Sequence, residues 1–213
     1  MRHLLCFGDS NTHGTRALRF LHDRRRLARA ERWPGVLEAA LGAAWQVIEE
    51  GHPGRTTVHA DPVEGAHKNG LAALPALLES HRPLDLVILM LGTNDLKARF
   101  AVPAYDIALS VERLVTMTAA SDSGPEGAAP AVLLVAPAPI EERGFLAESF
   151  AGGADKSRRL AGHLREMAER QRIPFFDAGG VAAVDPLDGI HLGAEAHARL
   201  GVALAEVVHS RWP

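Results

Sequence analysis

The segment Leu84–Leu91 constrains the fold of this chain more than any other, because it reads Leu-Asp-Leu-Val-Ile-Leu-Met-Leu. A run that is this short and nearly continuously apolar is expected of a β-strand buried on both faces. Strands of that kind belong to parallel sheets that carry helices on each side. The segment therefore points to an α/β fold.

Short apolar runs and helix-compatible segments alternate along the rest of the chain. Besides the run above, the predicted strands are Leu4–Phe7, Trp45–Ile48, Val132–Val135 and Pro174–Phe176. The predicted helices, which repeat apolar residues at helical spacing, are Pro34–Leu41, Leu71–Glu79, Pro103–Ala119, Asp155–Arg170 and Ala194–Val208. This alternation predicts one α/β domain over residues 1–213 with a five-stranded, mostly parallel sheet.

Composition excludes several classes of protein. The chain has 23 Lys and Arg against 26 Asp and Glu, so it lacks the overall basic charge of a nucleic-acid-binding protein. A single cysteine, Cys6, rules out an intrachain disulfide. No stretch approaches 18 apolar residues, and the N-terminal apolar run is too short for a signal peptide. We therefore expect a cytoplasmic protein with neither a membrane nor a nucleic acid as partner.

Polar, turn-prone segments follow the predicted strands. They are Gly8–Gly14, Gly51–Thr57, Gly92–Asp95 and, past a loop after the last strand, Asp188–His191. The carboxyl ends of parallel strands lie at one edge of the sheet, where α/β proteins bind their ligands. These four segments are therefore expected to converge on one site.

Three residues in these segments are the types that a serine hydrolase needs. Ser10 is the candidate nucleophile, His191 the candidate base, and Asp188 the group that would orient His191. The three-residue spacing of Asp188 and His191 in a glycine-containing turn allows the carboxylate to hold the imidazole N–H. The same segments offer donors for an oxyanion: the backbone N–H groups of Ser10 and Gly54 and the side-chain amide of Asn94.

Each segment taken alone is also a common turn, so the prediction depends on their combination. Gly8-Asp9-Ser10 is typical of a strand-end turn, and Gly92–Asp95 can be stabilised by Asx hydrogen bonds alone. His191 could simply cap the last helix. The agreement of order, strand-end placement and residue type favours the catalytic interpretation.

The four blocks resemble those of SGNH (GDSL-type) serine hydrolases. They are matched by Gly8-Asp9-Ser10-Asn11, Gly54, Gly92-Thr93-Asn94-Asp95 and Asp188-Gly189-Ile190-His191. Over nearly its whole length the chain is similar to the bacterial arylesterase/acyltransferase branch of that family. The resemblance implies a three-layer α/β/α fold with flavodoxin-like strand order, the triad and oxyanion donors named above, and no cofactor. It also implies hydrolysis of short-chain esters, often with acyl transfer to alcohols or peroxide, and a large homo-oligomer of up to eight subunits.

The residues around the predicted nucleophile indicate where this chain differs from its look-alikes. Two tryptophans usually follow the nucleophile block in that branch and wall the acyl pocket, whereas this chain has His13 and Thr15 there. Together with Asp9 and Asn11 these are the predicted pocket residues, although Asp9 can equally act as a turn residue. A pocket without indole walls holds more water, which predicts weaker acyl transfer. His13 as a second base is an open alternative.

Other interpretations of the sequence remain open. A carbohydrate O-deacetylase of the same family and a non-enzymatic oligomeric binding protein on the same fold are the alternatives to an esterase. The side chains of His52, His59, Asp61 and His67 lack a recognised metal-ligand spacing, so we expect surface histidines and no metal. The arginine-rich segment 16–32 is interpreted as a solvated face, with an anion-attracting rim or a subunit contact as the alternative.

Overall fold

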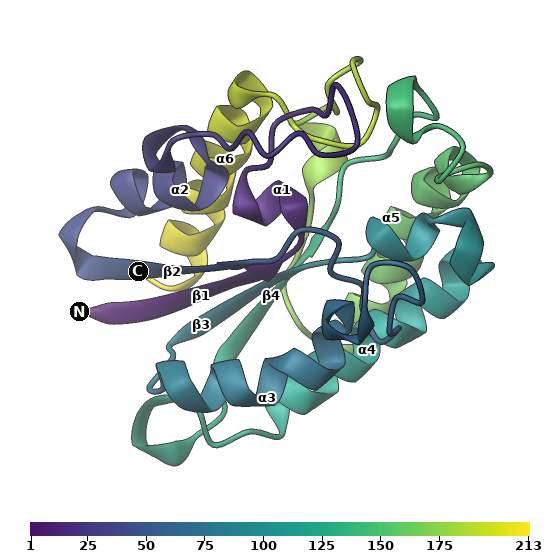
Figure 1. The fold of residues 1–213 in the computed structure, drawn as a ribbon. Helices are drawn as coiled ribbons and strands as arrows, with labels where there is room; N and C mark the ends of the chain where they lie inside the picture. The colour runs from purple at the N-terminus through teal and green to yellow at the C-terminus, as the bar shows by residue number, and fades with distance from the viewer.

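The computed structural model describes residues 1–213 and contains one five-stranded parallel sheet in the order β2-β1-β3-β4-β5 (Figure 1). The strands are β1 (Arg2–Gly8), β2 (Trp45–Gly51), β3 (Leu86–Met90), β4 (Ala131–Ala136) and β5 (Phe175–Asp177). All neighbouring strands pair in parallel. The predicted flavodoxin-like sheet is therefore confirmed.

Helices cover both faces of the sheet and make three layers (Figure 1). The helices are α1 (Ser10–His13), α2 (Trp33–Leu41), α3 (Gly70–His81), α4 (Ala104–Ala119), α5 (Gly153–Gln171) and α6 (Ala194–Arg211). Helices α2 and α6 pack together on one face, and α3, α4 and α5 lie on the other. The five longer helices coincide with the predicted segments. None of them combines the length and the apolar character needed to cross a membrane.

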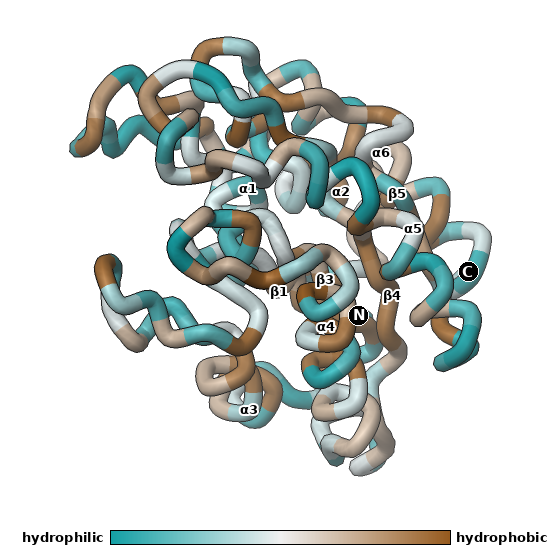
Figure 2. The backbone as a smooth tube through the Cα atoms, turned by 90° about the vertical axis from the view of Figure 1, so that its right-hand side faces the viewer, coloured by the Kyte–Doolittle hydropathy of each residue, from teal (hydrophilic) through white to brown (hydrophobic).

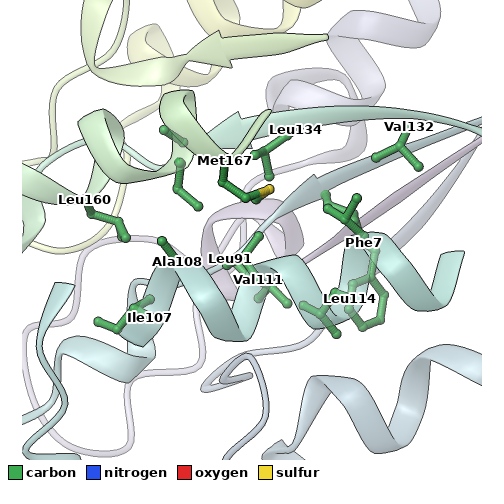
Figure 3. Packing of buried hydrophobic residues seen from close by; sticks show 14 of the residues in the cluster. Phe7, Leu91, Ile107, Ala108, Val111, Leu114, Val132, Leu134, Leu160 and Met167 are labelled. Carbon is green, nitrogen blue, oxygen red and sulfur yellow. The ribbon is translucent and has the colours of Figure 1, made fainter. Parts of the chain in front are cut away.

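Strand β3 explains why its sequence is apolar without interruption. Val87 and Leu89 point into the core shared with α3, α4 and α5, whereas Leu86, Ile88 and Met90 point into the core shared with α2 and α6. All five residues are at most 2% exposed. Figure 3 shows the first of these cores, and the hydrophobic stretches of the chain follow the inner strands (Figure 2). Burying such a side chain contributes about 1.5–3 kcal/mol to folding.

The carboxyl ends of the neighbouring strands β2, β1 and β3 are aligned, and this alignment positions the site. Gly8 pairs with Gly51 on one side and with Met90 on the other. A Cβ atom on Gly51 would lie 2.1 Å from the backbone nitrogen of His13. Glycine at the end of β2 therefore allows the short helix α1 to rest on the edge of the sheet, which brings Ser10 over the strand ends.

Candidate functional site

Ser10 is the first residue of α1, directly after the turn that ends β1. Asp9 caps this helix, since its Oδ1 accepts the N–H of Asn11 at 2.8 Å. Ser10 itself is only 5% exposed. The capped turn fixes the backbone on both sides of the serine.

Ser10, His191 and Asp188 form a continuous chain of hydrogen bonds. His191 Nε2 lies 3.1 Å from Ser10 Oγ, and His191 Nδ1 lies 2.6 Å from Asp188 Oδ2. Because an ionised carboxylate can only accept, the ring proton is assigned to Nδ1, which leaves Nε2 free to accept the Ser10 proton. This is the geometry that activation of a serine nucleophile requires.

The carboxylate of Asp188 is completely buried and is saturated with donors. Its Oδ1 accepts the N–H groups of Ile190 and His191 at 2.9 and 3.0 Å, and its Oδ2 accepts that of Leu18 at 2.7 Å. Burial alone would raise the pKa of Asp188, but the hydrogen bonds and charge of His191, together with the backbone donors, lower that pKa to about 2. Asp188 is therefore negative at neutral pH and can stabilise an imidazolium.

The side chain of Asn11 is hydrogen-bonded to the backbone on both sides of His191. Its Nδ2 donates to the carbonyl of Ile190 at 3.1 Å, and its Oδ1 accepts the N–H of Leu192 at 2.9 Å. These two residues flank His191 in the chain. The sequence predicts Asn11 as a pocket residue, but in the structure it does not line the cavity. Its hydrogen bonds instead connect α1 to the loop that carries His191.

The three predicted oxyanion donors, Ser10, Gly54 and Asn94, line one cavity. Gly54 has φ +80°, a conformation that favours glycine, and its backbone N–H donates to no acceptor in the protein. The Asn94 Nδ2 atom donates to the carbonyl of Arg55 at 3.1 Å, which occupies one of its two N–H groups. The second N–H is available to a bound group.

Two buried residues that the sequence did not single out, Arg55 and Asp95, hold these donors in place. The guanidinium of Arg55 donates to the carbonyls of Gly8 and Glu50, at the ends of β1 and β2, and lies 4.2 Å from the ring centroid of Phe7. Burial lowers the pKa of Arg55 to about 10. Through its hydrogen bonds to the carbonyls of Gly8 and Glu50, Arg55 holds the loop that carries Gly54 against the sheet.

Asp95 fixes the turn that carries Asn94. Its carboxylate accepts the Thr57 N–H at 3.0 Å and the Thr57 hydroxyl at 2.5 Å. Burial raises the pKa of Asp95 to about 7 although these hydrogen bonds oppose the shift. The pattern Thr-Asn-Asp in a strand-end turn was the only sequence signal for this role.

The cavity has a volume of about 540 Å³ and also includes His191, His13 and Thr15 in its lining. Asp9 and Asn11, which were also predicted as pocket residues, are buried and do not line it. The apolar part of the lining consists of Leu18, Leu21, Phe145, Leu146, Phe150 and Ile190. The cavity thus combines a hydrogen-bonded serine, free donors and an apolar wall.

His13 is hydrogen-bonded to Thr15 and not to Ser10. The His13 Nδ1 atom lies 3.0 Å from Thr15 Oγ1. Burial and the charges of Arg26 and Arg32 lower the pKa of His13 to about 4, so the ring is neutral at pH 7. The histidine hydrogen-bonded to the serine is His191.

The residues considered for a metal site make other contacts. His59 stacks on Phe100, Asp61 pairs with Arg99 at 2.9 Å, and His52 and His67 meet edge to face. No three His, Cys, Asp or Glu residues lie together in a way that could hold a metal ion.

The arginines of segment 16–32 have two kinds of surroundings. Arg16 pairs with Glu31, whereas Arg26, Arg29 and Arg32 pair with Glu49. Arg24 and Arg25 instead line the cavity. The interpretation as a solvated face therefore covers only part of the segment.

Comparison with known proteins places these residues in a family context. Residues 6–199 match the GDSL-like lipase/acylhydrolase family. The M. smegmatis aryl esterase is 43% identical with a TM-score of 0.93, and a carbohydrate acetylesterase from Sinorhizobium meliloti is 41% identical with a TM-score of 0.94. In both comparisons 99% of each chain is covered. A structure of the M. smegmatis enzyme with a bound inhibitor is 43% identical and has a TM-score of 0.94. A comparison with curated protein sequences gave no match.

Proposed function

The chain belongs to the GDSL-like lipase/acylhydrolase family, and from its site we propose that it is a serine esterase that hydrolyses short-chain aryl or alkyl esters. The observation that carries this proposal is the hydrogen-bonded chain from Ser10 through His191 to Asp188 at the cavity. Family membership makes the chain an ester-cleaving enzyme and disfavours a purely binding role.

In the first step Ser10 Oγ attacks the ester carbonyl carbon. His191 Nε2 takes the hydroxyl proton as the bond forms, and Asp188 stabilises the resulting imidazolium. The carbonyl electron pair moves onto its oxygen, where the N–H groups of Ser10 and Gly54 and the amide of Asn94 can donate. Removing one such donor typically costs about 10²–10³ in kcat.

In the second step the tetrahedral intermediate collapses. The carbon–oxygen bond to the alcohol breaks, His191 gives that alcohol its proton, and an acyl group remains on Ser10. Water then attacks the acyl-enzyme with His191 again as base, and free Ser10 and the carboxylic acid result. An alcohol or peroxide in place of water would give acyl transfer, which we propose as a side activity.

A kinetic comparison of two serine variants tests this proposal. Ser10→Ala should lower kcat for 4-nitrophenyl acetate by at least about 10³, because the nucleophile is lost. Ser123→Ala is the matched control, since Ser123 is also buried but lies outside the cavity, and its side-chain hydroxyl makes no hydrogen bond. It should retain activity within about twofold. Equal activities of the two variants would refute the proposed nucleophile.

A carbohydrate O-deacetylase is the second candidate. It is favoured by the polar and charged residues of the cavity and by the similarity to the Sinorhizobium meliloti carbohydrate acetylesterase. A panel of acetylated sugars and of aryl and alkyl esters with increasing acyl length separates the candidates. Higher kcat/KM on the acetylated sugars would replace the esterase proposal with this one.

Assembly and location remain predictions: the assembly follows from the family resemblance, and the location follows from the short N-terminal apolar run and the single cysteine. We propose a homo-oligomer, with eight subunits as the size to test, in the cytoplasm. Light scattering at micromolar concentration measures the mass directly. A clean monomer of 22.8 kDa would contradict the predicted assembly.

A further inference from the structure

The cavity at Ser10 holds more positive than negative side chains. Four cations line it, Arg24, Arg25, Lys68 and Lys97, together with two carboxylates, Asp23 and Glu64. Four charges against two leave an excess of two positive charges. The whole chain has net charge −3, so this excess is local to the cavity.

Two of the four cations are neutralised within the protein. Arg25 pairs with Asp23 at 2.7 Å, and Lys97 pairs with Glu64 and, at 3.6 Å, with Asp61. Asp23 and Glu64, the two carboxylates of the cavity, are thus both paired with a cation. The excess therefore resides on the other two cations.

Lys68 is a half-buried ammonium that has only neutral partners. Its Nζ donates to the carbonyl of Pro53 at 2.8 Å and lies 3.3 Å from His52 Nε2. Burial and nearby cations lower the pKa of His52 to about 4, so this ring is an uncharged acceptor at pH 7. No carboxylate lies within 4.0 Å of Lys68 Nζ. One of the three ammonium N–H groups has no partner in the protein.

Arg24 is the second cation without a partner. Its side chain is exposed at the cavity and pairs with no carboxylate. Burial lowers the pKa of Lys68 most, and the charges of Lys97 and Arg24 add to that shift although Glu64 opposes it. Because Lys68 and Arg24 both line the cavity, an anion bound there is attracted by both charges.

Lys68 also lies close to the reacting centre. Its Cε atom would be 3.2 Å from a Cβ atom placed on Gly54, one of the proposed oxyanion donors. The Glu64 Oε2 atom would be nearer to that position, at 2.5 Å, but the Glu64 carboxylate is paired with Lys97. A group bound by the ammonium therefore lies a few bonds from an ester carbonyl held at Gly54. An anionic group of the substrate itself can therefore reach the ammonium while its ester carbonyl lies at Gly54.

We infer that the cavity selects esters that carry a carboxylate, which Lys68 and Arg24 bind by ion pairing. The inference rests on the proposed esterase function and deepens it by naming a substrate class. The apolar residues of the lining, such as Phe145 and Leu146, accommodate the uncharged part of the ester. Part of the arginine-rich segment thus serves as an anion-attracting rim.

Matched pairs of esters test the inference on each side of the scissile bond. The leaving-group pair is 4-acetoxybenzoate and its neutral amide analogue, 4-acetoxybenzamide. The acyl pair is mono-4-nitrophenyl succinate and its neutral methyl ester. The measured quantity is the ratio of kcat/KM for the charged ester to that for the neutral one, at low salt and at about 0.5 M NaCl.

The wild type should prefer the charged ester in at least one pair by about tenfold, a preference that added salt reduces. Lys68→Met and Arg24→Gln should each lower that ratio by about three- to tenfold, and Lys68→Arg should retain most of it. Lys156→Met is the matched control, because Lys156 is similarly half-buried and donates to one backbone carbonyl, that of Val102 at 3.3 Å, outside the cavity. Its ratio should equal that of the wild type.

Ratios at or below one for both pairs in the wild type would overturn the inference, as would ratios that Lys68→Met and Arg24→Gln leave unchanged. Because Arg24 is exposed, Arg24→Gln leaves the fold intact and keeps the test decisive if Lys68→Met proves unstable. Hydrolysis of the neutral esters in the same assays, abolished by Ser10→Ala, would show that the proposed esterase function stands even if the charge preference fails.

Discussion

Replacing Asn11 with alanine should separate the positioning of His191 from general stability. The two hydrogen bonds of the Asn11 amide, at 3.1 and 2.9 Å, hold the carbonyl of Ile190 and the N–H of Leu192 on either side of the histidine. Asn11→Ala leaves both backbone groups buried without partners. At about 1–2 kcal/mol for each, the loss of unfolding free energy is about 2–4 kcal/mol.

The same substitution releases the loop that carries His191. A displacement of about 1 Å in a catalytic group costs on the order of 10² in rate. Asn11→Ala should therefore lower kcat for 4-nitrophenyl acetate by about 10- to 100-fold. KM should change little, because Asn11 does not line the cavity. Urea unfolding on the same samples gives the stability and shows that the protein assayed is folded.

Asn69→Ala is the control for this experiment. Asn69 also makes two hydrogen bonds to the backbone, to the carbonyl of Val58 at 2.8 Å and from the N–H of Ala72 at 3.1 Å, but neither residue flanks His191. Its loss should cost about 1–2 kcal/mol of stability and leave kcat within about threefold. If Asn11→Ala keeps kcat as well as Asn69→Ala does, the positioning role of Asn11 is wrong.

Three further results are expected. Asp188→Asn should lower kcat by about 10⁴ at pH 7, measured on an aryl acetate, because the amide cannot hold the His191 tautomer or stabilise its cation; a loss below tenfold would contradict this. Asp95 keeps its proton in the folded state up to about pH 7, so its contribution to stability is full below about pH 4 and is lost as the pH rises through 7. Urea unfolding from pH 4.5 to 7.5 should show a decline of up to about 4 kcal/mol, and Asp95→Asn should flatten it. Finally, with His13 and Thr15 in place of indole walls, the ratio of acyl transfer to hydrolysis in water–alcohol mixtures should be lower than that of the M. smegmatis aryl esterase; an equal or higher ratio would contradict this.

The fold was predictable because local pattern and buried environment agree in this chain. The uninterrupted run around β3 is buried on both faces, and the helical spacing in α4 and α5 matches the faces that pack on the sheet. Every predicted strand and long helix is present. The boundaries differ by a few residues, because hydrogen bonding and not apolar character decides where β2 and α5 end.

The site was predictable only in part. Strand-end placement brings Ser10, Gly54, Asn94 and His191 to one cavity as expected. The partners of Asn11 lie about 180 residues further along the chain, so no local pattern could reveal that it clamps the histidine loop.

The charge of the cavity was equally hidden from the sequence. Seven arginines in segment 16–32 look alike by composition, and only the fold distinguishes those that pair with Glu49 from Arg24, which has no counter-ion. Lys68 likewise faces the cavity only because its loop folds over Gly54. Such contacts depend on tertiary packing and not on residue spacing.

The central claim is that Ser10 is the nucleophile, and active-site labelling tests it most directly. A fluorophosphonate should modify the wild type at one residue, and peptide mass mapping should locate the adduct on Ser10. Ser10→Ala should remain unlabelled, whereas Ser123→Ala should be labelled like the wild type. An adduct on another residue, or an unlabelled wild type that hydrolyses no activated ester, would contradict the account.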